Sequence, residues 1–199
     1  MTDGRPTEWW LVRHAPTANP AKWVYGALDL DIVAPQPDAF AALSDMLPSD
    51  PVWLVTPLSR TRSTLEGILR ARGLADPEIH VEPAFAEQDF GAWEGMRLGE
   101  LPDIGPLNRA ELACHAPPDG ESFAALCARC TPALIELAST GGRVALIAHA
   151  GTIRAALALA IGSVAAGLAF EIVPLSLTAI RCFGGEDWAI GHVNRLPNH

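Results

Sequence analysis

Three short apolar runs, each followed by a segment with helical periodicity, place the strongest constraint on the fold of this chain. The runs are Trp9–Val12, Val52–Val55 and Val144–Ile147, and within each of them the apolar residues are consecutive rather than alternating. Consecutive apolar residues are typical of strands covered on both faces, and a helix after each strand is typical of a parallel sheet. The pattern predicts an α/β fold: a three-layer sandwich with a mainly parallel central sheet and helices on both faces.

The ends of two helices can be predicted from the residues that flank them. Residues 59–72 carry apolar side chains on one face and precede Gly73, and glycine is a common helix terminator. Residues 151–161 are expected to form a short apolar helix that is largely buried. Three further extended segments are expected: residues 80–85, and residues 177–183 and 188–193, which flank a Gly-Gly-Glu-Asp turn and predict a hairpin.

The chain has enough apolar material for a buried core, because 49% of its 199 residues are hydrophobic. A length near 200 fits one domain, so residues 1–199 are interpreted as a single domain. Residues 97–120 are rich in proline and glycine and contain few strand-forming residues. They are interpreted as a short lid inserted into that domain rather than as a second domain.

Charge and hydropathy disfavour nucleic-acid and membrane partners. The net charge is −9, whereas proteins that bind nucleic acid or anionic membranes present basic surfaces. The longest stretch without a charged residue, 155–170, is shorter than the ~20 residues needed to span a bilayer. The first ten residues lack the basic start and apolar run of a signal peptide. We therefore expect a cytoplasmic protein, and the sequence leaves a homodimer open.

Two cysteines lie three residues apart, a spacing that raises the question of a redox or zinc site. Cys127 and Cys130, however, fall among apolar residues that recur at the spacing of one helix face. No second ligand pair lies nearby, so core packing is the favoured interpretation and no metal site is expected.

Polar residues stand at the ends of the predicted strands, where open α/β sheets bind their ligands. Arg13 and His14 follow the first strand, Arg60 comes shortly after the second, and His149 follows the third. Glu87 follows the segment at 80–85. Arginine suits recognition of a dianion, an imidazole can attack it, and a carboxyl group can protonate the leaving oxygen. The constellation predicts attack by one imidazole on a dianionic oxyanion group, with the second imidazole stabilising charge.

These residues also carry a family resemblance. The segment Arg-His-Ala-Pro-Thr-Ala-Asn at 13–19 resembles the Arg-His-Gly-x-Thr-x-x-Asn signature of the histidine phosphatase (phosphoglycerate mutase-like) superfamily. Four further blocks resemble later elements of that family in the same order: Arg60 with Thr64, the acid-bearing loop at 87–95, Pro-Asp-Gly-Glu-Ser at 118–122, and the second-histidine motif at 148–154. Five blocks in order cover most of the chain.

The resemblance implies a role for each matching residue. His14 would be the nucleophile that becomes a phosphohistidine, and Glu87 the general acid and later base. A cage formed by Arg13, Arg60 and His149 would neutralise the phosphoryl oxygens. Asn19 and the backbone around Ala150 would add hydrogen bonds. No metal or other cofactor is implied, because arginine and histidine would supply the positive charge.

Several neighbouring residues have competing interpretations. Glu94 is the rival of Glu87 for the acid role, and the register of the resemblance favours Glu87. Arg154 is interpreted as a partner of a carboxylate or as a structural cap. Tyr25 resembles a residue on the substrate side in small family members, although a plain turn explains it equally. Ala15 and Ala150 replace a common glycine, which is tolerable if their φ angles are not positive.

The predicted function is metal-independent hydrolysis of a small phosphorylated metabolite. The second-histidine block is similar to that of α-ribazole phosphatases, which makes α-ribazole 5′-phosphate one candidate substrate. One alternative is phosphoryl transfer of the phosphoglycerate mutase type; the short lid, whose basic residues are Arg97 and Arg109, disfavours it. The other is a non-catalytic protein that binds phosphometabolites, which an intact nucleophile and acid disfavour.

Overall fold

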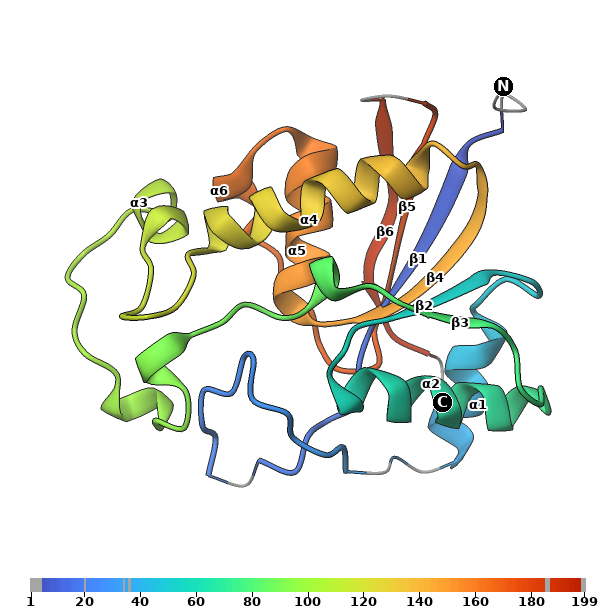
Figure 1. Cartoon of the computed structure of the whole chain (residues 1–199), viewed down its shortest axis with the longest axis horizontal. Coiled ribbons are helices and arrows are strands. Elements are labelled where there is room, and N and C mark those ends of the chain that lie inside the picture. Colours follow the sequence, from blue (N-terminus) through green and yellow to red (C-terminus); the bar gives the residue numbers. More distant parts are fainter. Residues whose placement is uncertain (1–4, 20, 34, 36, 185–186, 198–199) are drawn as a thin grey trace.

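The computed structural model of the chain describes residues 5–19, 21–33, 35, 37–184 and 187–197. Within these residues six strands form one sheet in the order β3-β2-β4-β1-β5-β6 (Figure 1). Neighbours among β1 to β4 pair in parallel, whereas β5 pairs antiparallel with β1 and β6, so the predicted mainly parallel sheet is confirmed. The strands are β1 (Thr7–Arg13), β2 (Val52–Val55), β3 (Ile79–Val81), β4 (Gly142–Ala148), β5 (Leu177–Cys182) and β6 (Trp188–Arg195).

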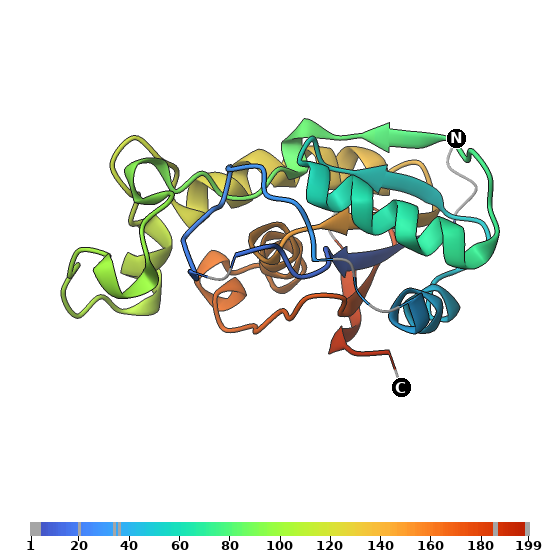
Figure 2. The same ribbon diagram turned by 90° about the horizontal axis from the view of Figure 1, so that it is seen from below.

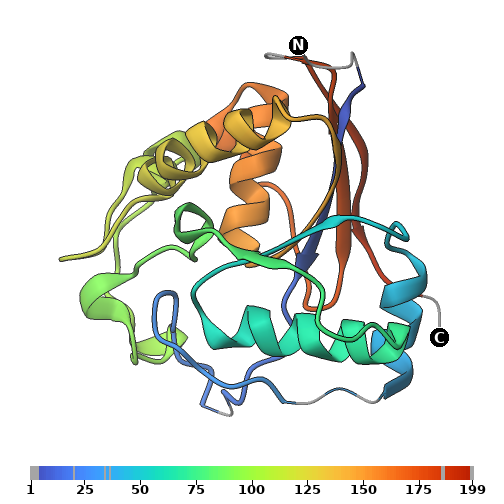
Figure 3. The same cartoon turned by 45° about the vertical axis from the view of Figure 1, so that its right-hand side comes forward.

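Helices cover both faces of this sheet, as predicted (Figure 3). On one face, α1 (Pro37–Asp45) and α2 (Ser59–Arg72) bury Phe40 and Ile68 against Val55 and Ile147. On the other, α4 and α5 enclose a second core that includes Cys127 and Cys130, so their predicted role in core packing is confirmed. The helices of this second layer are α3 (Arg109–Cys114), α4 (Phe123–Ala138), α5 (Ala150–Ile161) and α6 (Val164–Gly167).

A glycine ends each of the two helices whose C-terminal ends were predicted correctly, α2 and α5. Helix α2 runs from Ser59 to Arg72, and Gly73 follows it with φ 65° and donates its N–H to the Arg70 carbonyl. Gly162 ends α5 in the same way, with φ 74°. A residue without Cβ adopts this left-handed conformation at little energetic cost, so the helix has a defined end.

The predicted strand at 80–85 is wrong from residue 82 onward. Strand β3 ends at Val81, and Pro83–Phe85 form a 3₁₀ helix, η1. Proline has no N–H to donate to a strand partner, and the Glu82 side chain accepts a hydrogen bond from the Ala84 N–H, which stabilises the turn. Glu87 therefore follows a 3₁₀ turn rather than a strand.

The segment from residue 97 to 120 projects away from the sheet (Figure 2). It contains the 3₁₀ helix η3 (Leu98–Glu100) and helix α3, which packs against α4 and α6. The acid-bearing loop contains the 3₁₀ helix η2 (Gly91–Trp93), and the Trp93 ring stacks on the His115 ring with their centroids 5.6 Å apart. This contact joins the loop to the projecting segment. Among the described helices, none combines the length and hydrophobicity needed to cross a membrane.

Candidate active site

The carboxyl ends of β1 and β4 bring the two motif histidines together. His14 directly follows β1, and His149 directly follows β4. The backbone N–H of His14 donates to the Ala148 carbonyl at 2.9 Å, which extends the pairing of the two strands by one residue. Their ring centroids are 5.2 Å apart and the ring planes are inclined by 62°. His14 is 2% exposed and His149 is fully buried. Two residues 135 positions apart in the sequence thus share one site.

A backbone carbonyl determines the tautomer of His14. The Nδ1 atom lies 2.7 Å from the Ala15 carbonyl oxygen. Because a carbonyl oxygen accepts hydrogen bonds only, Nδ1 must carry the proton, which leaves a lone pair on Nε2 in the neutral ring. The Thr64 hydroxyl on α2 accepts from the Ala15 N–H at 2.9 Å and donates to the Arg60 carbonyl at 2.7 Å, so this helix fixes the peptide that orients His14.

His149 has the opposite tautomer, set by two side chains. The Nε atom of Arg60 donates to Nδ1 of His149 at 3.3 Å, so Nδ1 is unprotonated. The proton is therefore on Nε2, which lies 2.8 Å from the hydroxyl oxygen of Thr56, at the end of β2. Three neighbouring parallel strands thus lead into His14, His149 and Thr56: the His149 and Thr56 side chains are hydrogen-bonded, and the His14 ring contacts the His149 ring.

Burial keeps both rings neutral. It lowers the pKa of His14 to about 3; the bond to the Ala15 carbonyl opposes this shift, and the charges of Arg60 and Arg13 add to it. Burial also lowers the pKa of His149 well below its ordinary value, and Arg60 contributes to the shift in the same direction. A neutral His14 has its Nε2 lone pair available for bonding at neutral pH.

These shifts predict that the protein loses stability in acid. Below pH 6.5 the unfolded chain binds protons at His14 and His149, whereas the folded chain does not. The free energy of unfolding therefore decreases as the pH is lowered. Each proton contributes about 1.4 kcal/mol per pH unit, and the two together approach about 3 kcal/mol per unit. Urea unfolding at pH 7, 6 and 5 measures this slope. The double variant His14→Gln/His149→Gln should give a clearly flatter profile, and parallel profiles would contradict the assignment.

Arg60 is fully buried and joins the histidine pair to the segment 26–28. Its Nη1 donates to the Leu28 carbonyl at 2.7 Å and its Nη2 to the Gly26 carbonyl at 2.6 Å. Its guanidinium carbon lies 5.2 Å from the centroid of the Tyr25 ring. In this structure Arg60 therefore acts on the site through His149 and through this segment, and its predicted contact with a phosphoryl oxygen stays a prediction.

The two rival carboxylates of the acid-bearing loop lie in different environments. Glu94 accepts hydrogen bonds from the Ala27, Leu28 and Phe90 N–H groups at 2.6 to 3.1 Å and so anchors the segment 26–28. Glu87 instead lines a cavity at the N-terminus of α5. Glu87 is thus the one of these two carboxylates that lines the described cavity, and its role as the acid stays a prediction.

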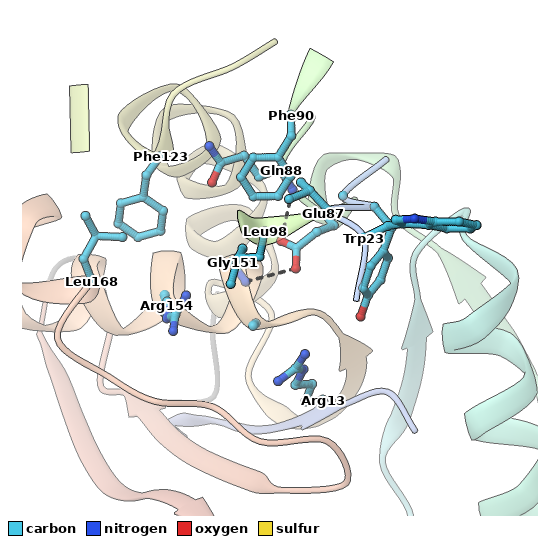
Figure 4. A pocket seen from close by; sticks show the side chains of 14 residues that line it. Arg13, Trp23, Glu87, Gln88, Phe90, Leu98, Phe123, Gly151, Arg154 and Leu168 are labelled. Atoms are coloured by element: carbon cyan, nitrogen blue, oxygen red, sulfur yellow. Dashed lines mark hydrogen bonds between the residues drawn. The ribbon is translucent and has the colours of Figure 1, made fainter. Parts of the chain in front are cut away.

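The Glu87 carboxylate points at the first turn of α5. Its Oε2 accepts from the Gly151 N–H at 3.2 Å, and its Oε1 accepts from the Gln88 N–H at 3.0 Å (Figure 4). A Cβ at position 151 would lie 2.2 Å from Oε1, so glycine is required for this close approach. Arg129 on α4 donates to the carbonyls of Ala84, Ala86 and Glu87 and thereby holds the loop in place.

The cavity beside Glu87 has a volume of about 240 Å³. Two guanidinium groups line it, those of Arg13 and Arg154, and the backbone at Ala150 and Gly151 completes that side. Carbonyl oxygens orient both arginines: Nη1 of Arg13 donates to Ile172, and Nε of Arg154 donates to Phe170. An anion-binding helix N-terminus and two cations thus face the same space as the carboxyl group of Glu87.

The side-chain hydrogen bonds that the structure describes for Asn19 are local. Its Nδ2 donates to the Trp23 carbonyl at 2.8 Å, and its Oδ1 accepts from the Trp23 N–H at 2.9 Å. Asn19 is not one of the described residues that line the cavity beside Glu87. Its predicted hydrogen bond to a phosphoryl group stays a prediction.

The sequence analysis did not identify three residues that contribute to the site. Arg154 was interpreted as a structural residue, but it lies one helical turn beyond Gly151, and this i, i+3 spacing could have placed it on the same face of α5. Thr56 could have been found as the polar residue that ends β2. Arg129 had no comparable signal, because its hydrogen bonds depend on how α4 packs against the acid-bearing loop.

The two alanines that replace common glycines fit this geometry. Neither Ala15 nor Ala150 is among the described residues with a positive φ angle, so the methyl groups introduce no backbone strain. Within the described residues, no group of three or more histidine, cysteine, aspartate or glutamate side chains could hold a metal ion.

Comparison with known proteins identifies the family. The sequence model of the histidine phosphatase superfamily (branch 1) matches residues 9–195, nearly the whole chain. The chain belongs to the histidine phosphatase superfamily. None of the curated proteins matches this sequence.

Solved structures of the same fold include several phosphatases. A mycobacterial glucosyl-3-phosphoglycerate phosphatase is 25% identical, with a TM-score of 0.78 over 96% of this chain and 100% of that one. The α-ribazole phosphatase of Shigella flexneri is 21% identical, with a TM-score of 0.78 over 96% of this chain and 99% of that one. A protein described as mycobacterial hydrolase 2 is 24% identical, with a TM-score of 0.81 over 98% of this chain and 93% of that one.

Proposed function

We propose that this protein hydrolyses small phosphate monoesters through a phosphohistidine formed on His14. The observation that carries the proposal is the tautomer of His14. Its Nδ1–H is bonded to the Ala15 carbonyl, and the ring is neutral, so Nε2 is the free nucleophilic atom. A residue that served only to bind an anion would gain from a protonated ring, whereas this site keeps the ring uncharged.

The proposed reaction has two steps. In the first, Nε2 of His14 attacks phosphorus, the bond from phosphorus to the alcohol oxygen breaks, and Glu87 gives its proton to that oxygen. In the second, Glu87 takes a proton from water, the water oxygen attacks phosphorus, and the bond from phosphorus to Nε2 breaks. Arg13, Arg154 and the N-terminus of α5 supply the positive potential for the phosphoryl oxygens from the cavity side.

The position of the basic residues supports hydrolysis over mutase-type transfer. Arg97 and Arg109, the basic residues of the projecting segment, are absent from the described lining of the cavity. A mutase must retain a doubly phosphorylated species and exclude water, which requires additional cations around the bound substrate. A water-accessible site with two guanidinium groups suits transfer of the phosphoryl group to water.

Hydrolysis of an aryl phosphate in the presence of excess chelator tests the proposal. We expect turnover of 4-nitrophenyl phosphate to be unchanged by EDTA and by added Mg²⁺, because guanidinium, imidazole and amide groups supply the charge that a metal supplies elsewhere. Loss of activity in EDTA with recovery in Mg²⁺ would contradict the proposal. The next substrates to test are α-ribazole 5′-phosphate and glucosyl-3-phosphoglycerate, because two structural neighbours are named as phosphatases of these compounds.

A further inference from the structure

The cavity beside Glu87 has two guanidinium groups on one side and, on the other, two phenylalanine rings with the uncharged amide of Gln88 between them (Figure 4). In the view of Figure 4, Arg13 and Arg154 lie on one side of the Glu87 carboxylate, and Phe90 and Phe123 lie on the other. Leu168 lies next to Phe123. The phosphoryl group is drawn to the cations, so the remainder of the substrate extends past Glu87 toward the aromatic and aliphatic side chains.

Two apolar side chains at the rim of the cavity are exposed to solvent. Leu98 is 71% exposed and Trp23 is 44% exposed, and both line the cavity. An antiparallel bridge between Trp23 and Arg97, the neighbour of Leu98, holds the two segments together. Exposed apolar groups that gather at the mouth of a cavity are typical of a ligand-binding surface.

From these observations we propose the substrate class: a phosphate monoester of a small, apolar alcohol, aryl or short alkyl, without a second anionic group. The inference rests on the function proposed above. Both cations of the cavity lie on the phosphoryl side, so a carboxylate or second phosphate on the alcohol would meet Phe90, Phe123 and Leu168 without a counter-charge. The volume of about 240 Å³ falls below the ~300–1,000 Å³ of sites for drug-sized ligands, so the alcohol is small.

A series of alkyl phosphates tests this inference, because their leaving alcohols have similar basicity and differ mainly in apolar surface. We expect kcat/KM to rise about two- to fourfold with each methylene group from ethyl to butyl phosphate, and so by roughly tenfold in total. 3-Phosphoglycerate should be a poorer substrate than butyl phosphate by at least about tenfold. A flat alkyl series, or a preference for 3-phosphoglycerate, would overturn the inference while leaving the phosphatase proposal in place. No hydrolysis of any of these esters would overturn both.

A matched pair of leucine variants tests whether the alcohol part of the substrate contacts Leu98 and the apolar side chains of the cavity, which together form its apolar wall. Leu98 and Leu112 are both exposed residues of the projecting segment, but Leu112 does not line the cavity among the described residues. Leu98→Ser should reduce kcat/KM for butyl phosphate more than kcat/KM for ethyl phosphate, so that the preference for butyl over ethyl phosphate falls about threefold. Leu112→Ser should change neither value. An unchanged preference in Leu98→Ser, or an equal loss in both variants, would contradict the placement of the alcohol against this wall.

Discussion

Replacing His14 by asparagine is expected to lower kcat/KM for phosphate monoesters by at least about 10⁴-fold, because the substitution removes the nitrogen that attacks phosphorus in the proposed reaction. Asparagine is the informative substitution. Its amide nitrogen can donate to the Ala15 carbonyl in place of Nδ1, so the local fold is retained while Nε2 is lost. Steady-state hydrolysis of 4-nitrophenyl phosphate measures the effect.

His80→Asn is the matched control. His80 lies on β3 with half of its side chain exposed, and its imidazole faces Glu78 at 3.6 Å, away from the cavity lining. Its replacement should leave kcat/KM unchanged within about twofold. Comparable rates for wild type and His14→Asn would exclude His14 as the nucleophile.

Glu87→Gln is expected to slow alkyl phosphates by about 10² to 10⁴-fold and aryl phosphates by less than about tenfold. An alkoxide must be protonated as it leaves, whereas a nitrophenolate leaves without a proton. The glutamine oxygen can accept from only one of the two N–H groups, Gln88 or Gly151, that donate to the two oxygens of Glu87, and this loss affects both substrates alike. The ratio of kcat/KM for butyl phosphate to that for 4-nitrophenyl phosphate is the quantity to measure.

Glu94→Gln provides the comparison within the same loop. Glu94 anchors the segment 26–28 through backbone N–H groups, so its replacement should change both substrates by a similar factor and leave their ratio unchanged. If Glu94→Gln shifted the ratio and Glu87→Gln did not, the acid assignment would be reversed.

The features that the sequence predicted are those that depend on neighbours along the chain. The end of helix α2 was predicted correctly because Gly73 accepts a left-handed conformation, and β2 was predicted because its four apolar residues are consecutive. The meeting of His14 and His149 followed from parallel strands whose carboxyl ends share one edge of the sheet.

The features that the sequence did not predict depend on tertiary contacts. The bonds of Arg60 to the Gly26 and Leu28 carbonyls require the segment 26–28 to lie against α2, and no periodic pattern encodes that placement. The strand at 80–85 was predicted too long because its apolar residues suit a strand, whereas Pro83 and the cap formed by Glu82 end it. Arg154 was interpreted from its own identity rather than from its spacing to Gly151.

Trapping the phosphorylated enzyme is the most direct test of the central claim, that Nε2 of His14 bonds to phosphorus during turnover. Enzyme mixed with ³²P-labelled phenyl phosphate, quenched in alkali within milliseconds and digested should yield one labelled peptide. That peptide should contain His14, with an acid-labile, alkali-stable phosphate on Nε2. Turnover without any phosphorylated peptide, or with the label on another residue, would contradict the account.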